Sequence, residues 1–128
     1  MSKIITPADA GFTRGNYHKW REQEKERRGF RCEWDGCDEI GAELHECIVT
    51  RKDAMGLPSD KWLRIFANCN MILLCRYHHE AAHAMSNSRT SWWVKMCGIY
   101  GFGPMVRWYN GFEWKVPDRR FDGTNTSI

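Results

Sequence analysis

The positions of cysteine and histidine constrain the fold of this chain more than any other feature of its sequence. Three of the five histidines fall in the segment Cys75–His83, and a fourth, His45, follows the cysteine pair Cys32 and Cys37. Cysteine and histidine are the side chains that most often bind transition metals. A chain of 128 residues forms one domain with a modest core. Bound metal would therefore add to its stability.

The first ligand set consists of two local pairs. Cys32 and Cys37 flank a glycine-containing turn, and Cys75 and His78 have the spacing of a zinc half-site at a predicted strand–helix junction. Four such ligands match tetrahedral structural zinc, which would clamp the turn to the start of the helix. The other three cysteines are expected to be small buried hydrophobic residues, although the sequence leaves open that one of them replaces a ligand. They are Cys47, Cys69 and Cys97.

A second ligand set follows from helix geometry. Neighbouring residues on an α-helix diverge by about 100°, whereas residues four apart share a face. His78 and His79 therefore cannot easily serve one ion, but His79 and His83 can, with His45 as a natural third ligand. Three protein ligands leave positions open for water and substrate, as a catalytic metal requires.

The remaining pattern predicts a single α+β domain over residues 14–121, with a core of about 30–85 and a helical extension of about 90–121. Residues 1–13 are expected to be a flexible leader and residues 122–128 a flexible tail. Helices are expected over 17–28, 60–66 and 76–85, with two more between 92 and 114. Strands over 39–42 and 44–49 are expected to form a hairpin, and 71–74 is a buried apolar run.

Charge and hydropathy indicate the environment of the chain. It has no apolar run of eighteen residues and no signal-peptide pattern, which predicts a cytoplasmic protein without a membrane partner. Paired cysteines in that compartment more often bind metal than form disulfides. The net charge is only +3, but arginine and lysine are concentrated over residues 14–31. That segment is either a solvated helix face or a phosphate-contacting surface.

The order of these ligands resembles that of the zinc-stapled HNH nucleases. The resemblance covers about residues 17–85 and rests on Cys32…Cys37, Glu43-Leu44-His45-Glu46 and Asn70–His79, followed by His83. It implies a ββα-metal core, as in the nuclease colicins, flanked by an N-terminal helix and C-terminal helices. It also implies hydrolysis of phosphodiester bonds in DNA with one divalent cation (Mg²⁺, Mn²⁺, Ni²⁺ or Zn²⁺).

The resemblance implies roles for individual residues. The ligands of the catalytic cation would be His45, His79 and His83. The structural zinc would be held by Cys32, Cys37, Cys75 and His78, with His78 in place of the more frequent cysteine. Asn70 would hold the neighbouring loop in shape. Phosphates beside the cleaved bond would be contacted by Arg51, Lys52 and Arg76.

Glu46 departs from the family pattern, which commonly has a second histidine as general base at this position. A histidine is well poised to deprotonate water at neutral pH, whereas an ordinary glutamate is a weaker base. Glu46 could act as the base, bind the metal or leave the site weak. An alternative register makes His45 the base and puts Leu44 at a ligand position, which loses one metal ligand.

Two other interpretations compete with a nuclease. The same fold could bind DNA or a protein partner without catalysis. His79-Glu80-Ala81-Ala82-His83 also matches the H-E-x-x-H pattern of zinc metallopeptidases, with Glu113 as the most plausible third ligand. The family resemblance suggests a phage or mobile-element protein acting in the cytoplasm of a bacterial host, as a homodimer or with a phage or host partner.

Overall fold

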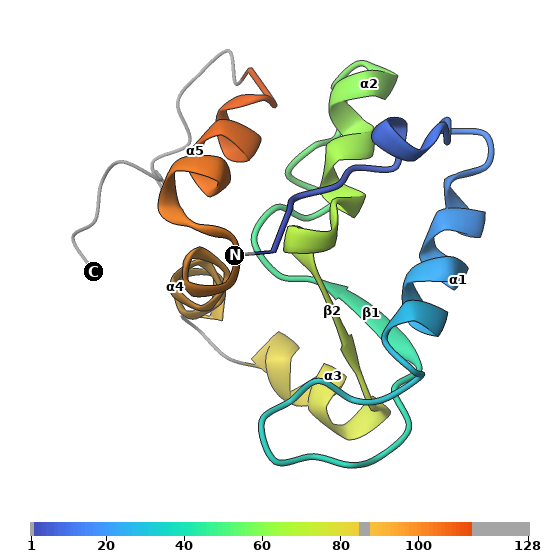
Figure 1. Cartoon of the computed structure of the whole chain (residues 1–128), viewed down its shortest axis with the longest axis vertical. Coiled ribbons are helices and arrows are strands. Elements are labelled where there is room, and N and C mark those ends of the chain that lie inside the picture. Colours follow the sequence, from blue (N-terminus) through green and yellow to red (C-terminus); the bar gives the residue numbers. More distant parts are fainter. Residues whose placement is uncertain (1, 85–87, 114–128) are drawn as a thin grey trace.

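The computed structural model describes residues 2–84 and 88–113, which form a small α+β domain (Figure 1). A two-stranded antiparallel sheet lies between α1 on one side and α4 and α5 on the other. The helices are α1 (Tyr17–Arg27), α2 (Ser59–Trp62), α3 (Arg76–Ala84), α4 (Ser88–Tyr100) and α5 (Phe102–Asn110). The strands are β1 (Glu43–Glu46) and β2 (Met71–Leu74), and short 3₁₀ turns cover Ala8–Ala10, Leu63–Phe66 and Asn68–Asn70.

The sheet pairs two segments that are far apart in the sequence. His45 of β1 stands opposite Ile72 of β2, so the predicted hairpin between residues 39–42 and 44–49 is wrong. The apolar side chains of β2 are all buried, so other elements must pack on both faces of this strand. Ile40, in the first strand of the predicted hairpin, is exposed and does not contribute to that packing. Residues near Gly41 instead pack against the edge of the sheet. A Cβ at Gly41 would lie 2.6 Å from Leu73 Cγ.

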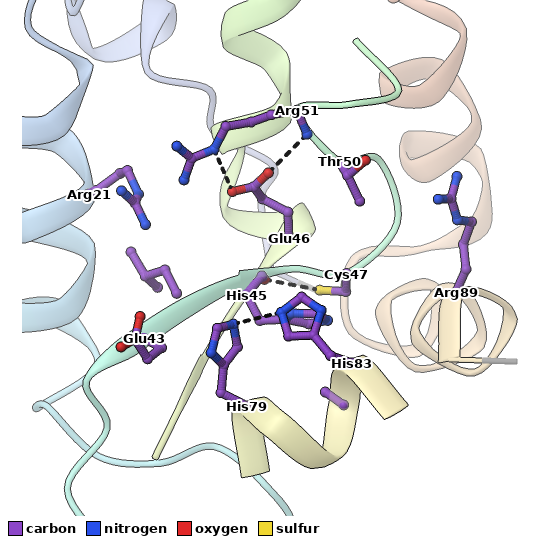
Figure 2. A pocket seen from close by; sticks show the side chains of 12 residues that line it. Arg21, Glu43, His45, Glu46, Cys47, Thr50, Arg51, His79, His83 and Arg89 are labelled. Carbon is purple, nitrogen blue, oxygen red and sulfur yellow. Dashed lines mark hydrogen bonds and ion pairs between the residues drawn. The ribbon is translucent and has the colours of Figure 1, made fainter. Parts of the chain in front are cut away.

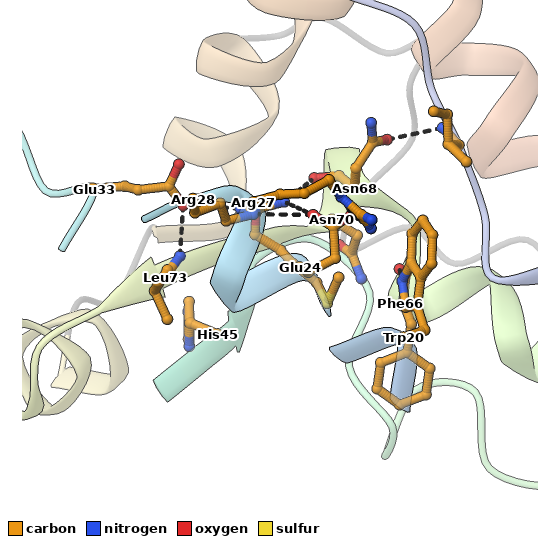
Figure 3. Close-up of polar contacts among 12 residues, drawn as sticks. Trp20, Glu24, Arg27, Arg28, Glu33, His45, Phe66, Asn68, Asn70 and Leu73 are labelled. Atoms are coloured by element: carbon orange, nitrogen blue, oxygen red, sulfur yellow. Dashed lines mark hydrogen bonds and ion pairs between the residues drawn. The ribbon is translucent and has the colours of Figure 1, made fainter. Parts of the chain in front are cut away.

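A partly buried ionic network joins α1 to β2 (Figure 3). Arg28 Nε donates to Glu24 Oε2 at 3.1 Å, and its Nη1 donates to the carbonyl of Met71 at 2.8 Å. Arg28 also binds Glu33, whose Oε1 accepts from the backbone N–H of Leu73 at 2.7 Å. Part of the basic segment therefore serves the fold, because a buried charge requires a partner of this kind.

The N-terminal segment, for which the sequence predicts a flexible leader over residues 1–13, contacts the domain near residues 3–7. The backbone N–H of Ile5 donates to Asn68 Oδ1 at 2.9 Å, and Asn68 Nδ2 donates to the carbonyl of Lys3 at 2.9 Å. Thr6 and Pro7 are buried. Sequence patterns of helix and strand do not detect such a segment, because a side chain from elsewhere satisfies its backbone.

The C-terminal helices complete the core. Trp92, Trp93 and Trp108 are buried, and Trp108 Nε1 donates to the carbonyl of Arg64 at 3.0 Å. These tryptophans therefore serve core packing.

Three predictions fall on residues that the structure does not describe: Trp114, the domain boundary at residue 121 and the tail at 122–128. Within the described ranges, no helix combines the length and the apolar character needed to cross a membrane.

Candidate metal centres

Three cysteines and one histidine converge where the turn after α1 meets the start of α3. The ligand atoms of Cys32, Cys37, Cys75 and His78 all lie within 4.8 Å of one another. Gly36 closes the turn with φ +81°, a conformation that L side chains rarely adopt. His78 Nδ1 lies 3.3 Å from Cys75 Sγ and 3.6 Å from Cys32 Sγ. Three thiols and an imidazole in this arrangement could hold a metal ion such as zinc.

The electrostatics of this cluster favour a metal-binding thiolate. Burial opposes ionisation of the Cys32 thiol, but hydrogen bonds from the backbone N–H groups of Cys75 and Trp34, then from His78, lower its pKa to about 7. The indole of Trp34 stacks on the His78 ring with centroids 4.7 Å apart. This stacking fixes the ring plane of His78 and so the direction of its Nδ1.

The other cysteines lie away from this cluster. Cys47 and Cys69 are buried, and burial raises the pKa of both thiols. Cys97 is partly buried, and burial also raises the pKa of its thiol. The expectation that Cys47 and Cys69 are small buried hydrophobic residues is confirmed. Cys97 is only partly buried.

Three histidines form a second cluster on the other side of α3 (Figure 2). The ligand nitrogens of His45, His79 and His83 lie within 4.8 Å of one another. The Nε2 atoms of His79 and His83 are 3.1 Å apart, as expected for residues one helical turn apart on the same face. His45 faces them from β1, and its ring centroid lies 4.9 Å from that of His83. His78 and His79 thus belong to different clusters.

Burial and repulsion between neighbouring imidazoles lower the pKa of two histidines of the second cluster, His45 and His79. Burial, followed by the proximity of His83 and His79, lowers the pKa of His45 to about 4. Burial, and then His83, also lowers the pKa of His79. A neutral imidazole has a free lone pair, so the lowered pKa values of His45 and His79 favour cation binding by these two side chains.

The histidine cluster lies in a cleft of about 390 Å³. β1, the loop that follows it, α1, α3 and α4 contribute to its walls (Figure 2). Its charged lining residues other than the histidines are Arg21, Glu43, Glu46, Arg51 and Arg89.

The carboxylate of Glu46, expected as a general base or ligand, is bound by Arg51. The backbone N–H of Arg51 donates to Glu46 Oε1 at 3.1 Å, and its Nε donates to Oε2 at 3.0 Å. Glu46 is not one of the residues whose ligand atoms converge with the histidines. Adjacent residues on a strand point to opposite faces, which explains why His45 turns to α3 and Glu46 away from it.

Asn70 is fully buried behind the cleft. Its Oδ1 accepts hydrogen bonds from the backbone N–H groups of Ile48 and Val49, at 2.9 and 3.0 Å. Its Nδ2 donates to the carbonyls of Val49 and Ile65, both at 2.7 Å. The side chain therefore ties the loop after β1 to the segment that precedes β2.

Of the three predicted phosphate contacts, the cleft lining includes only Arg51. Lys52 is exposed and lies outside the lining, and the side chain of Arg76 is 91% exposed on α3. Sequence reasoning missed Arg21 and Arg89, which line the cleft from α1 and α4. Arg21 belongs to the basic segment 14–31, but nothing in the sequence separates it from its neighbours.

The two glutamates that a metallopeptidase would use, Glu80 as the base and Glu113 as the third ligand, both lie outside the lining of the histidine cleft. Glu80 is exposed and lies 4.0 Å from Arg76. Glu113 Oε2 lies 2.7 Å from Lys61 Nζ, and Glu113 does not line the histidine cleft.

Comparisons with protein-family models, with curated proteins and with solved structures find no match to this chain.

Proposed function

We propose that this chain is a metal-dependent endonuclease of the HNH type that hydrolyses phosphodiester bonds in DNA. In this proposal, β1, β2 and α3 form a ββα-metal core. The observation that carries it is the division of two neighbouring histidines between two clusters. His78 joins three thiols, and His79 joins His45 and His83 in a cleft lined by arginines.

The donor set of the cleft fits a divalent cation. Three imidazoles suit zinc, nickel or other transition ions, whereas Mg²⁺ prefers oxygen ligands. We therefore rank Mn²⁺, Ni²⁺ and Zn²⁺ above Mg²⁺ as the activating ion. Once bound, such an ion would supply Lewis-acid stabilisation of the charge that develops on the phosphate during cleavage.

The surrounding residues support this chemistry through binding and position. Arg51 and Arg89 present guanidinium groups to the cleft, and guanidinium matches the geometry of phosphate oxygens. Asn70 holds the loop that carries Arg51. Arg89 is anchored at 2.9 Å by Asp53 of that same loop. Both arginines are thus attached to the backbone that follows His45.

A second candidate is a non-catalytic module that binds nucleic acid through the same cleft. The contact between Glu46 and Arg51 favours it, since both carboxylate oxygens already accept hydrogen bonds from Arg51, one from its backbone N–H and one from its guanidinium. The cleft lining also contains no imidazole beyond the three of the cluster. This candidate predicts DNA binding that weakens with salt but no cleavage.

Plasmid nicking tests the proposal. Wild-type protein should convert supercoiled DNA to the open-circular form when Mn²⁺, Ni²⁺ or Zn²⁺ is added. His83→Ala, which alters an exposed side chain, should lower the rate by about a hundredfold or more because it removes a metal ligand. Glu80→Ala is the matched control on the same helix and should cleave like wild type. Equal rates for wild type and His83→Ala would reject the site, and loss of nicking in Glu80→Ala would mean that Glu80 takes part in DNA cleavage.

A further inference from the structure

Two arginines from distant parts of the chain lie against one aromatic ring beside the histidine cleft. The guanidinium carbon of Arg21, on α1, is 5.8 Å from the centroid of the Phe66 ring, and that of Arg51 is 5.4 Å away. Phe66 is fully buried. Both arginines line the cleft, with Arg21 reaching in from α1 and Arg51 from the loop after β1 (Figure 2).

Their charges are compensated unequally. Arg51 is paired with Glu46 through two hydrogen bonds. In the part of the chain that the structure describes, Arg21 makes no ion pair, and its Nε is enclosed without a hydrogen-bond partner. Glu43 also lines the cleft, but no ion pair joins it to Arg21. Arg21 therefore brings to the cleft wall a positive charge that no carboxylate of the described residues pairs with.

We propose that Arg21 and Arg51 form a phosphate-binding site on the α1 side of the cleft. This site takes a phosphate of the nucleic-acid strand next to the bond that lies at the histidines. Glu46 is then a positioning residue that orients Arg51, in place of a general base. The inference rests on the proposed function, because a phosphodiester strand is what would bring one phosphate to the histidines and the next to the arginines.

The chemistry of the pair favours phosphate over other anions. Guanidinium presents its N–H donors in a planar fork that matches two phosphate oxygens, and contact with an aromatic face fixes that plane. Arg21 and Arg51 reach the cleft from different elements and can hold an anion between them. The lining of the whole cleft contains three guanidinium groups and two carboxylates, and the guanidinium groups on the α1 side are those of Arg21 and Arg51.

DNA binding without added divalent cations tests the role of Arg21 apart from cleavage. We would measure fluorescence anisotropy of a labelled duplex at several salt concentrations. Arg21→Ala should weaken binding roughly tenfold or more. It should also reduce the slope of log K against log salt by about 0.9, which corresponds to one lost phosphate contact. Lys19→Ala is the matched control, since it removes one exposed charge from the same helix outside the cleft. It should leave the slope unchanged.

Substitutions of Glu46 separate a positioning residue from a base. Glu46→Gln keeps an oxygen that accepts from Arg51 and should lower kcat by less than about tenfold. Glu46→Ala should raise KM as Arg51→Ala does, and the double variant should be no worse than Arg51→Ala alone, because the two residues act as one unit. A fall in kcat of a hundredfold or more in Glu46→Gln at constant KM would overturn this role and restore the general base.

The outcomes distinguish this inference from the function on which it rests. If wild type binds DNA and Arg21→Ala keeps the wild-type affinity and salt slope, the phosphate site is wrong and the nuclease proposal stands. If binding depends on Arg21 but no cation supports cleavage, the phosphate site is supported and the nuclease proposal is rejected. A wild-type protein that neither binds nor cleaves DNA overturns both.

Discussion

The side chain of Asn70 offers the sharpest test of how the fold supports the cleft. Asn70→Ala removes four hydrogen bonds and leaves two backbone N–H groups and two carbonyls without their partner in a fully buried place. An unsatisfied buried polar group costs about 1–3 kcal/mol. We expect the larger costs at the N–H groups of Ile48 and Val49, because an N–H makes a single hydrogen bond whereas a carbonyl oxygen has two lone pairs. With partial relaxation, we expect a loss of about 4 kcal/mol in the free energy of unfolding.

Asn68→Ala is the matched control for this substitution. Its side chain also bonds to the backbone, at Ile5 and Lys3, but lies half-buried where water can replace it. We expect a loss of about 1 kcal/mol or less. Urea unfolding followed by circular dichroism measures both variants, and Asn70→Ala should also melt roughly 15 °C below wild type. Similar losses in the two variants would refute the claim that Asn70 holds the loop.

Three further predictions concern the ions, pH and packing. Cys75→Ser, or a strong chelator, should remove the ion at the thiol cluster and lower the melting temperature, while a mutation of buried Cys69 to alanine should leave zinc content unchanged. In protein without an ion at the histidines, the low pKa of His45, about 4, means that the unfolded chain binds the proton more tightly. Stability should therefore fall as pH drops from about 6.5 toward 4, and this fall should shrink in His45→Gln as measured by urea unfolding. Gly41→Ala should destabilise by about 1–3 kcal/mol, since its Cβ would lie 2.6 Å from Leu73 Cγ and 2.9 Å from the backbone of Arg31. An unchanged urea midpoint in Gly41→Ala would show that the segment can shift.

Local sequence patterns predicted the helices and the two groups of cysteine and histidine residues that come together in the structure. The i,i+4 spacing of His79 and His83, together with the angle between His78 and His79, is a property of any α-helix. This geometry alone determines which of these imidazoles can share an ion. The two clusters found in the structure consist of the same residues.

Long-range features were beyond these patterns. The pairing of β1 with β2 depends on which segment covers Met71–Leu74, and local alternation favoured a nearer partner. The packed N-terminal segment depends on Asn68, more than sixty positions away. Arg21 was indistinguishable from the other cations of α1 until the structure placed it against Phe66. Glu46 could be singled out by the sequence, but its pairing with Arg51 could not.

Metal stoichiometry tests the central claim most directly. Native mass spectrometry of protein loaded with Zn²⁺ should show two ions for each wild-type chain. His83→Ala should hold one ion with sulfur ligands in its X-ray absorption spectrum, and Cys75→Ser should lose that sulfur signature. A single ion in wild type with both sulfur and several imidazole ligands, lost equally in both variants, would contradict the account.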